Sequence, residues 1–356
     1  MKRRIPSLVA ALAALPVAVL PVAAPASAAH AAPDRPVQAA PARPAAAAPE
    51  ERPVIAVLVG FTDKRFADPA AERAKARDAF FGSGSSVATY FKTVSGGRVT
   101  FPSARGRVVG PWNLDMPASC DHKRMASLVE ARMKAQGLDP ARYRHVSILF
   151  PAGGCGWAGL ATVNGRTSWM PKGYSTAGLI HEIGHNLGLG HEATRACPTG
   201  KLTGCADAGY RGKTSVMGGG GPHVGLSAPA LVRLGWHTAA ERVVPTRTGT
   251  HEITPLYGAG RRFLDIAIPG SADRLVVEYR RRGQAPDVDV AQGVIAYLVP
   301  GGKYEKALQI DPTPETTEKG STALPWGGAF RDRGITVKVL GWDAKGARVW
   351  VKLPTS

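Results

Sequence analysis

The stretch STAGLIHEIGHNLGLGH, residues 175–191, decides how this chain is interpreted. We expect Ser175 or Thr176 to cap a helix that ends at Gly188, because glycine tolerates the left-handed backbone that a chain reversal needs. His181 and His185 lie four residues apart, so both imidazoles project from one face of that helix. The reversal then brings His191 toward them.

This arrangement of three histidines predicts a metal site. Three neutral imidazole nitrogens hold Zn²⁺ and leave a fourth tetrahedral position open to water, which is the pattern of catalytic rather than structural zinc. Glu182 follows the first histidine and is the predicted general base and acid, which takes a proton from the metal-activated water and passes it to the leaving amine. One catalytic Zn²⁺ is the predicted cofactor, and no EF-hand pattern supports Ca²⁺.

The same stretch resembles the metzincin signature H-E-x-x-H-x-x-G-x-x-H at all five fixed positions, and Met217 fits the Met-turn of that group. The runs CGWAGLA (155–161), VMGGGG (216–221), SAP (227–229) and LGW (234–236) are similar to the gametolysin-like family of secreted metallopeptidases, over roughly residues 54–240. The resemblance implies a zinc peptidase with a metzincin catalytic domain. It departs from several metzincin groups at position 219, which is not Tyr, so no tyrosine is assigned to the oxyanion.

The pattern of predicted helices and strands along the chain indicates two folded domains. Residues 54–244 mix strands and helices and predict an α+β, metzincin-like catalytic domain with a mixed sheet, a zinc helix and the Met-turn. Residues 245–356 predict a smaller all-β, sandwich-like C-terminal domain, because helical periodicity is absent there. The first domain is expected to begin with the strand Val54–Val59 and to contain helices over Pro69–Phe80, from Ser85 or Ser86 through Val94, and over Asp121–Gln136. The second is expected to contain strands over Glu252–Leu256, Arg262–Ile268, Leu275–Arg281, Val294–Val299, Ile335–Leu340 and Ala347–Leu353.

The N-terminus predicts export. Residues 1–28 begin with Lys2, Arg3 and Arg4, continue with an apolar stretch and end in small residues at 26–28, which is typical of a signal peptide. An uncleaved membrane anchor is the competing interpretation, and three prolines in the apolar stretch argue against it. Residues 29–53 are rich in Ala and Pro and predict a linker or short propeptide. We therefore expect a secreted, extracellular protein that keeps no membrane attachment after cleavage.

Export also sets the chemistry of the cysteines. The four of them, Cys120, Cys155, Cys197 and Cys205, would lie in an oxidising compartment where disulfides form. Cys197 and Cys205 bracket a short loop, and Cys120 and Cys155 are the natural second pair. Four cysteines allow three pairings, and the sequence does not choose among them.

The net charge and residue composition indicate which classes of molecule the protein could bind. The 356 residues carry a net charge of +18, with 44% hydrophobic and 20% charged residues, which excludes a wholly disordered chain. The basic residues favour anionic wall or matrix polymers as partners. They are scattered except at Arg280–Arg282, which we interpret as solvated, and no signature supports specific nucleic-acid binding. Asp287 is interpreted as a solvated loop residue, and Trp326, Trp342 and Trp350 as packing residues rather than a sugar-binding face.

Together these patterns predict a secreted zinc-dependent endopeptidase that hydrolyses peptide bonds of extracellular proteins. The alternative, from another class, is a wall- or matrix-binding protein with a vestigial zinc site, which rests on the basic composition and the β-rich C-terminal region. A zinc hydrolase of a non-peptide amide or ester is a weaker third hypothesis.

Overall fold

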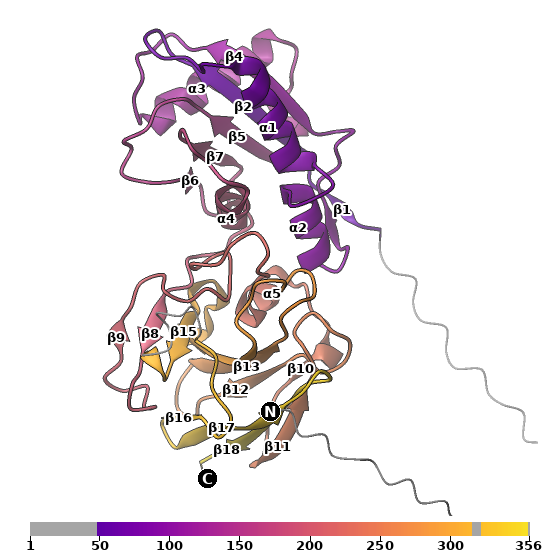
Figure 1. The fold of residues 1–356 in the computed structure, drawn as a ribbon, viewed down its shortest axis with the longest axis vertical. Coiled ribbons are helices and arrows are strands. Elements are labelled where there is room, and N and C mark those ends of the chain that lie inside the picture. Colours follow the sequence, from indigo (N-terminus) through magenta and orange to yellow (C-terminus); the bar gives the residue numbers. More distant parts are fainter. Residues whose placement is uncertain (1–47, 315–321, 355–356) are drawn as a thin grey trace, which may run out of the picture. The chain divides into compact units, whose positions relative to one another are not determined.

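The computed structural model describes residues 48–314 and 322–354 (Figure 1). The predicted signal peptide, residues 1–28, and most of the predicted linker lie outside the described residues and stay predictions. The described residues belong to one compact unit.

A five-stranded sheet is built around one apolar strand. β2 (Val54–Gly60) is buried along its whole length and lies parallel to β4 (Arg107–Asn113) on one side and β5 (His145–Leu149) on the other. β7 (Thr167–Met170) continues the sheet in parallel, and β6 (Leu160–Ala161) closes it as an antiparallel edge. A parallel strand covered on both faces must be apolar throughout, which is why β2 has no alternating pattern.

Helices cover both faces of this sheet. The alternate residues Val54, Ala56 and Leu58 share a core with α1, α2 and α4, whereas Ile55, Val57 and Val59 share another core with α3. Asp68, Ser86 and Asp121 each accept a hydrogen bond from a backbone N–H in the first turn of the helix that follows, so the predicted helix starts are confirmed. The helices are α1 (Pro69–Phe81), α2 (Val87–Val94), α3 (His122–Ala135), α4 (Thr176–Asn186) and α5 (Ala228–Leu234), with 3₁₀ turns η1 (Pro140–Arg142), η2 (Ala239–Glu241), η3 (Pro300–Gly302) and η4 (Tyr304–Lys306). A short parallel pair joins β1 (Glu50–Glu51) to β3 (Val99–Thr100).

Two further sheets share a core made of alternating apolar side chains. The first has seven strands in the order β10 (Arg242–Val243), β12 (Phe263–Ala267), β13 (Arg274–Arg280), β14 (Gly293–Val299), β15 (Leu308–Asp311), β8 (Thr194–Ala196) and β9 (Ala206–Asp207). The second has four, in the order β11 (Gly249–Ile253), β18 (Ala347–Lys352), β17 (Ile335–Trp342) and β16 (Ala329–Asp332). Leu264 and Val277 of the larger sheet lie in one cluster with Val339 and Val349 of the smaller.

The larger sheet draws strands from both sides of residue 244. β8 pairs in parallel with β15, so β8, β9 and β10 from before residue 244 share one sheet with β12, β13, β14 and β15 from after it. The mixed α+β class is confirmed, and the division of the chain at 244 and 245 stays a prediction. Among the helices of residues 48–314 and 322–354, none has the length and apolar character needed to cross a membrane.

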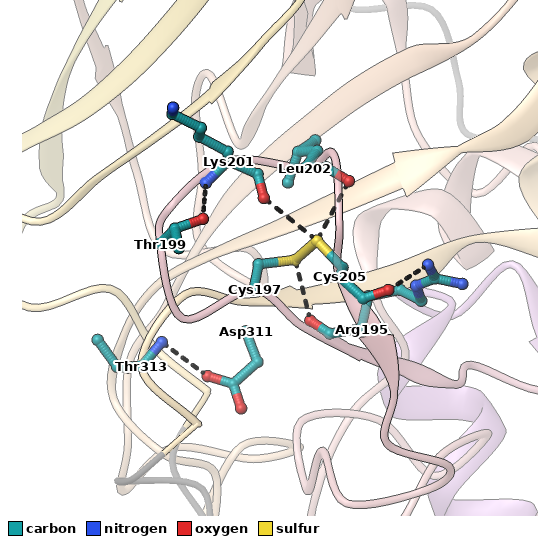
Figure 2. The surroundings of a disulfide bond; sticks show 8 residues. All are labelled: Arg195, Cys197, Thr199, Lys201, Leu202, Cys205, Asp311 and Thr313. Atoms are coloured by element: carbon teal, nitrogen blue, oxygen red, sulfur yellow. Dashed lines mark hydrogen bonds between the residues drawn. A yellow bond between two sulfur atoms is a disulfide. The ribbon is translucent and has the colours of Figure 1, made fainter.

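Two disulfides use all four cysteines. Cys120 pairs with Cys155, and Cys197 pairs with Cys205. Figure 2 shows the second bridge, which closes the loop between β8 and β9, with the guanidinium of Arg195 donating to the carbonyl of Cys205 at 2.7 Å. These bridges fit a protein of an oxidising compartment.

Four interpretations of the sequence are wrong. Arg280 is fully buried rather than solvated, because it forms ion pairs with Glu278 and Asp287, and Asp287 is itself only 3% exposed. Trp326 is 67% exposed and does not pack in the core. The first strand of the C-terminal region lies at Gly249–Ile253, a few residues earlier than expected, because it pairs with β18 there.

Candidate metal centre

Helix α4 carries the first two histidines. Ser175 begins it, with its hydroxyl accepting a hydrogen bond from the Gly178 N–H at 3.1 Å. His181 and His185 then lie one turn apart, and their ring centroids are separated by 4.7 Å. Asn186 holds the C-terminal end, because its side-chain amide donates to the carbonyls of Thr162 and Thr167.

A tight reversal positions the third histidine. Gly188 has φ +94, a conformation that favours glycine, and Leu189 N–H donates back to the Gly184 carbonyl at 3.1 Å. The ring of His191 thereby lies 4.6 Å from that of His185 and 5.1 Å from that of His181, centroid to centroid. One potential ligand atom from each of the three residues falls within 4.8 Å of the others.

Each imidazole is oriented through its Nδ1 atom. His181 Nδ1 lies 2.8 Å from the Val216 carbonyl and His185 Nδ1 lies 2.8 Å from the Leu189 carbonyl. A carbonyl oxygen only accepts, so these two Nδ1 atoms carry the proton and leave Nε2 with a free lone pair. His191 Nδ1 lies 2.7 Å from the hydroxyl of Tyr210, which either donates or accepts.

The three rings fit a divalent cation. Nε2 of His185 and Nε2 of His191 are 3.0 Å apart and face each other. Burial lowers the pKa of His181 to about 4 and also lowers the pKa of His185 and His191, which favours the neutral form that binds metal. Convergent, neutral and fixed imidazoles are a donor set suited to zinc.

Glu182, which follows His181 on helix α4, is buried. Its residue is 6% exposed, and burial raises the pKa of its carboxyl to about 7. Within the described residues, no side chain or backbone donor forms a hydrogen bond with it. Gly159 lies against the carboxylate so closely that a Cβ at that position would overlap Oε1. A nearby cation would act in the opposite direction to burial and favour the ionised carboxylate.

Met217 lies against the same helix. Its side chain is fully buried, and its sulfur occupies the space that a side chain on Gly184 would need. The Met217 carbonyl accepts from the N–H of Glu192, the residue after the third histidine, at 3.0 Å. The backbone that carries His191 and the backbone that carries Met217 are therefore hydrogen-bonded neighbours.

Sequence reasoning missed Tyr210. The metzincin pattern places a tyrosine two residues after Met217. Tyr210 instead lies before Met217 in the chain and contacts His191 from the loop after β9. A usable signal existed, since Tyr210 is the one tyrosine between His191 and Met217 in the sequence. His223, which the sequence left as a polar loop residue, is exposed and does not belong to the histidine cluster.

The residues around Glu192 were also missed. Its carboxylate is buried and accepts from the hydroxyl of Ser227, and burial raises its pKa to about 7. Ser227 is in turn the N-cap of α5. No local pattern in the sequence announces this contact, because the two residues are 35 positions apart.

The chain matches the model of the gametolysin peptidase M11 family over residues 55–263, which is more than half of its length. The protein is therefore a metallopeptidase. It belongs to the gametolysin family, and peptides or proteins are its substrates.

Other comparisons add little. None of the curated proteins compared with the chain matched it. Among solved structures, wild-type OgpA from Akkermansia muciniphila is 12% identical, with 72% of this chain and 90% of that chain covered and a TM-score of 0.34. Catalytically inactive OgpA with an O-glycopeptide substrate is 10% identical, with 72% and 91% covered and a TM-score of 0.34. A chaperone–substrate complex is 17% identical, with 52% of this chain but only 30% of that chain covered and a TM-score of 0.31. At these TM-scores nothing about this chain follows from the likeness.

Proposed function

We propose that this protein is a secreted zinc endopeptidase of the metzincin type. The observation that carries the proposal is the convergence of the His181, His185 and His191 rings, with the buried Glu182 following His181 on the same helix. Family membership supports the peptidase chemistry, and the full H-E-x-x-H-x-x-G-x-x-H signature supports the metzincin type.

His181, His185 and His191 are the proposed zinc ligands through their Nε2 atoms. Zinc bound there would supply Lewis acidity, polarising the scissile carbonyl and lowering the pKa of a water molecule. Val216 and Leu189 hold two of the rings through their carbonyls, and Tyr210 holds the third through its hydroxyl. Their role is to keep the Nε2 lone pairs aimed at one point.

Glu182 is the proposed proton carrier. Its carboxylate would accept a proton from the attacking water and later give it to the leaving amine, so that no acyl-enzyme forms. The close approach of Gly159 restricts where the carboxylate can lie. Met217 would support the site from below the helix, since its sulfur packs on the α4 backbone at Gly184.

The wider assignment rests on the sequence. The signal-peptide pattern at 1–28 supports secretion, and the two disulfides agree with an oxidising compartment. We assign residues 54–244 to the catalytic domain and 245–356 to a β-sandwich-like domain. Extracellular proteins are the proposed substrates, and anionic wall or matrix polymers are proposed as neighbours of the basic chain.

The substitution Glu182→Gln tests this function. We expect hydrolysis of casein or a reporter peptide to fall by about 100-fold or more, because proton transfer by a positioned group contributes about 10²–10⁴-fold, while the bound zinc per chain stays unchanged. Glu130→Gln makes the same chemical change on an exposed residue of α3 and should leave turnover at the wild-type level.

Three results would overturn the proposal. Wild-type turnover in Glu182→Gln would show that Glu182 does not carry the proton. If a chelator does not inhibit hydrolysis by the wild-type protein, the reaction does not depend on a metal ion. Absence of any hydrolysis by zinc-loaded wild-type protein would favour the alternative, a binding protein with a vestigial site.

A further inference from the structure

Two indole rings form an exposed corner on the four-stranded sheet. Trp326 is 67% exposed, and its ring centroid lies 5.9 Å from that of Trp342 with the ring planes at 84°. Trp326 sits on a turn that is fixed to β17, because Gly327 N–H donates to the Val339 carbonyl and Val339 N–H donates to Gly328. The exposed ring is therefore carried by a hydrogen-bonded turn.

A β-bulge at Gly341 lies next to this ring. β17 shifts register between Val339 and Gly341, and Gly341 has φ +152. A Cβ at Gly341 would lie 3.8 Å from the Trp326 indole. The bulge therefore lies within van der Waals reach of one edge of Trp326, whose side chain is otherwise largely exposed.

The indoles line a hollow of about 750 Å³ whose other walls are charged. Arg261, Lys345 and Arg348 contribute three cations, and within the described residues none of them forms an ion pair. Of the two acids, Asp343 already accepts from the N–H groups of Lys345 and Gly346. Glu252 lies opposite Arg348 in the β11–β18 register and is the other acid.

We propose that this hollow binds a saccharide chain that carries carboxylate groups. A sugar ring has an apolar C–H face that stacks on an exposed indole, and it presents hydroxyl and carboxylate groups at its rim to charged side chains. The volume lies within the range of about 300–1,000 Å³ typical of small-molecule sites and accommodates a few sugar rings.

The charges argue against other occupants. An apolar peptide segment would remove water from several cationic side chains without giving them hydrogen-bond partners. The free-energy cost of that desolvation exceeds the gain from burying the exposed indole. A methylated ammonium group would meet three cations around the aromatic corner instead of the acidic surroundings that a cation needs. None of the residues that line the hollow belongs to the histidine cluster, so the site does not depend on the proposed peptidase mechanism.

The test is to measure, by isothermal titration calorimetry, the binding of an oligogalacturonate of defined length to the full-length protein. We expect Trp326→Ala to weaken binding at least tenfold, and Arg348→Gln to weaken it as well. Trp350→Ala removes another indole from β18 that does not line the hollow, and it should leave the affinity unchanged. Peptide turnover should be the same in Trp326→Ala as in the wild type, which separates this site from the metal centre.

Four outcomes would overturn the proposal. Equal affinity of the wild type and Trp326→Ala, or no binding at all, would remove the site. Equal binding of polyglutamate of the same charge would show that charge alone acts. Equal binding of a neutral glucan of the same length would remove the requirement for carboxylate.

Discussion

At the scale of single residues, the three imidazoles are held by unequal partners. His181 and His185 donate to backbone carbonyls, which fix the protonated nitrogen, whereas His191 meets the hydroxyl of Tyr210, which fixes none. His191 is also the exposed member of the cluster. Tyr210 therefore provides the side-chain contact for the one proposed ligand that is exposed and that no backbone carbonyl orients.

Removing that hydroxyl should loosen the third ligand. We expect Tyr210→Phe to weaken zinc binding by about 10-fold to 100-fold, the usual cost of losing a partner of a ligating histidine. Competition with a chromophoric chelator measures the affinity directly. Tyr143→Phe, which removes a hydroxyl without a hydrogen bond in the described residues, is the control. Unchanged zinc affinity in Tyr210→Phe would show that the contact does not orient His191.

At the scale of elements, helix α4 and the segment around Met217 pack unusually closely. Gly184 lies between His181 and His185 on α4, and the Met217 sulfur occupies the place where a side chain at 184 would be. Glycine inside a helix costs about 1 kcal/mol relative to alanine, so this position gives up helix stability for a close approach. Helix propensity alone would favour alanine over glycine at position 184.

The substitution Gly184→Ala weighs these two effects. Forcing an extra carbon into a packed core costs about 1–3 kcal/mol, which exceeds the gain in helix propensity. We expect urea unfolding to show a net loss of up to about 2 kcal/mol. In a Met217→Ala background the sulfur is absent, and the same substitution should become stabilising. A loss of equal size in both backgrounds would contradict the packing argument.

At the scale of the whole molecule, a buried ion cluster in the C-terminal sheet holds the loop around Met217. Arg280 donates to the Thr214 carbonyl at 2.6 Å and pairs with Glu278 and Asp287. Those carboxylates accept from backbone N–H groups on the other side of Met217, Glu278 from Ala228 and Asp287 from Gly225. The seven-stranded sheet therefore takes part in positioning the metal centre through this loop.

Removing the cation should destabilise the fold sharply. Arg280→Met leaves two carboxylates buried without their shared partner, and we expect a loss of about 3–5 kcal/mol in the free energy of unfolding. Arg282→Met, two positions along in the same basic run, changes an exposed residue and should stay within about 0.5 kcal/mol of the wild type. Urea denaturation of both variants makes the comparison. Similar stabilities would mean that the cluster does not hold the loop.

Much of the fold followed from local patterns. Asp68, Ser86 and Asp121 begin helices where their capping chemistry predicts, and the apolar run at Val54–Val59 became the central strand. The short strand β8 was not expected, since three residues carry no periodicity and their state depends on pairing with β15. The exposure of Trp326 was misjudged for a related reason, because composition does not reveal which side of a turn an indole occupies.

The amino-acid sequence by itself determined that His181 and His185 share a helical face, that Glu182 stands beside them and that the chain reverses at Gly188. These features depend on helix geometry and on glycine's backbone freedom, which act within one turn. Only the tertiary structure decided that Tyr210 orients His191 and that Arg280 holds the loop around Met217. Such contacts join residues 19 and 66 positions apart, and they form only when separate elements pack together, so no local period encodes them.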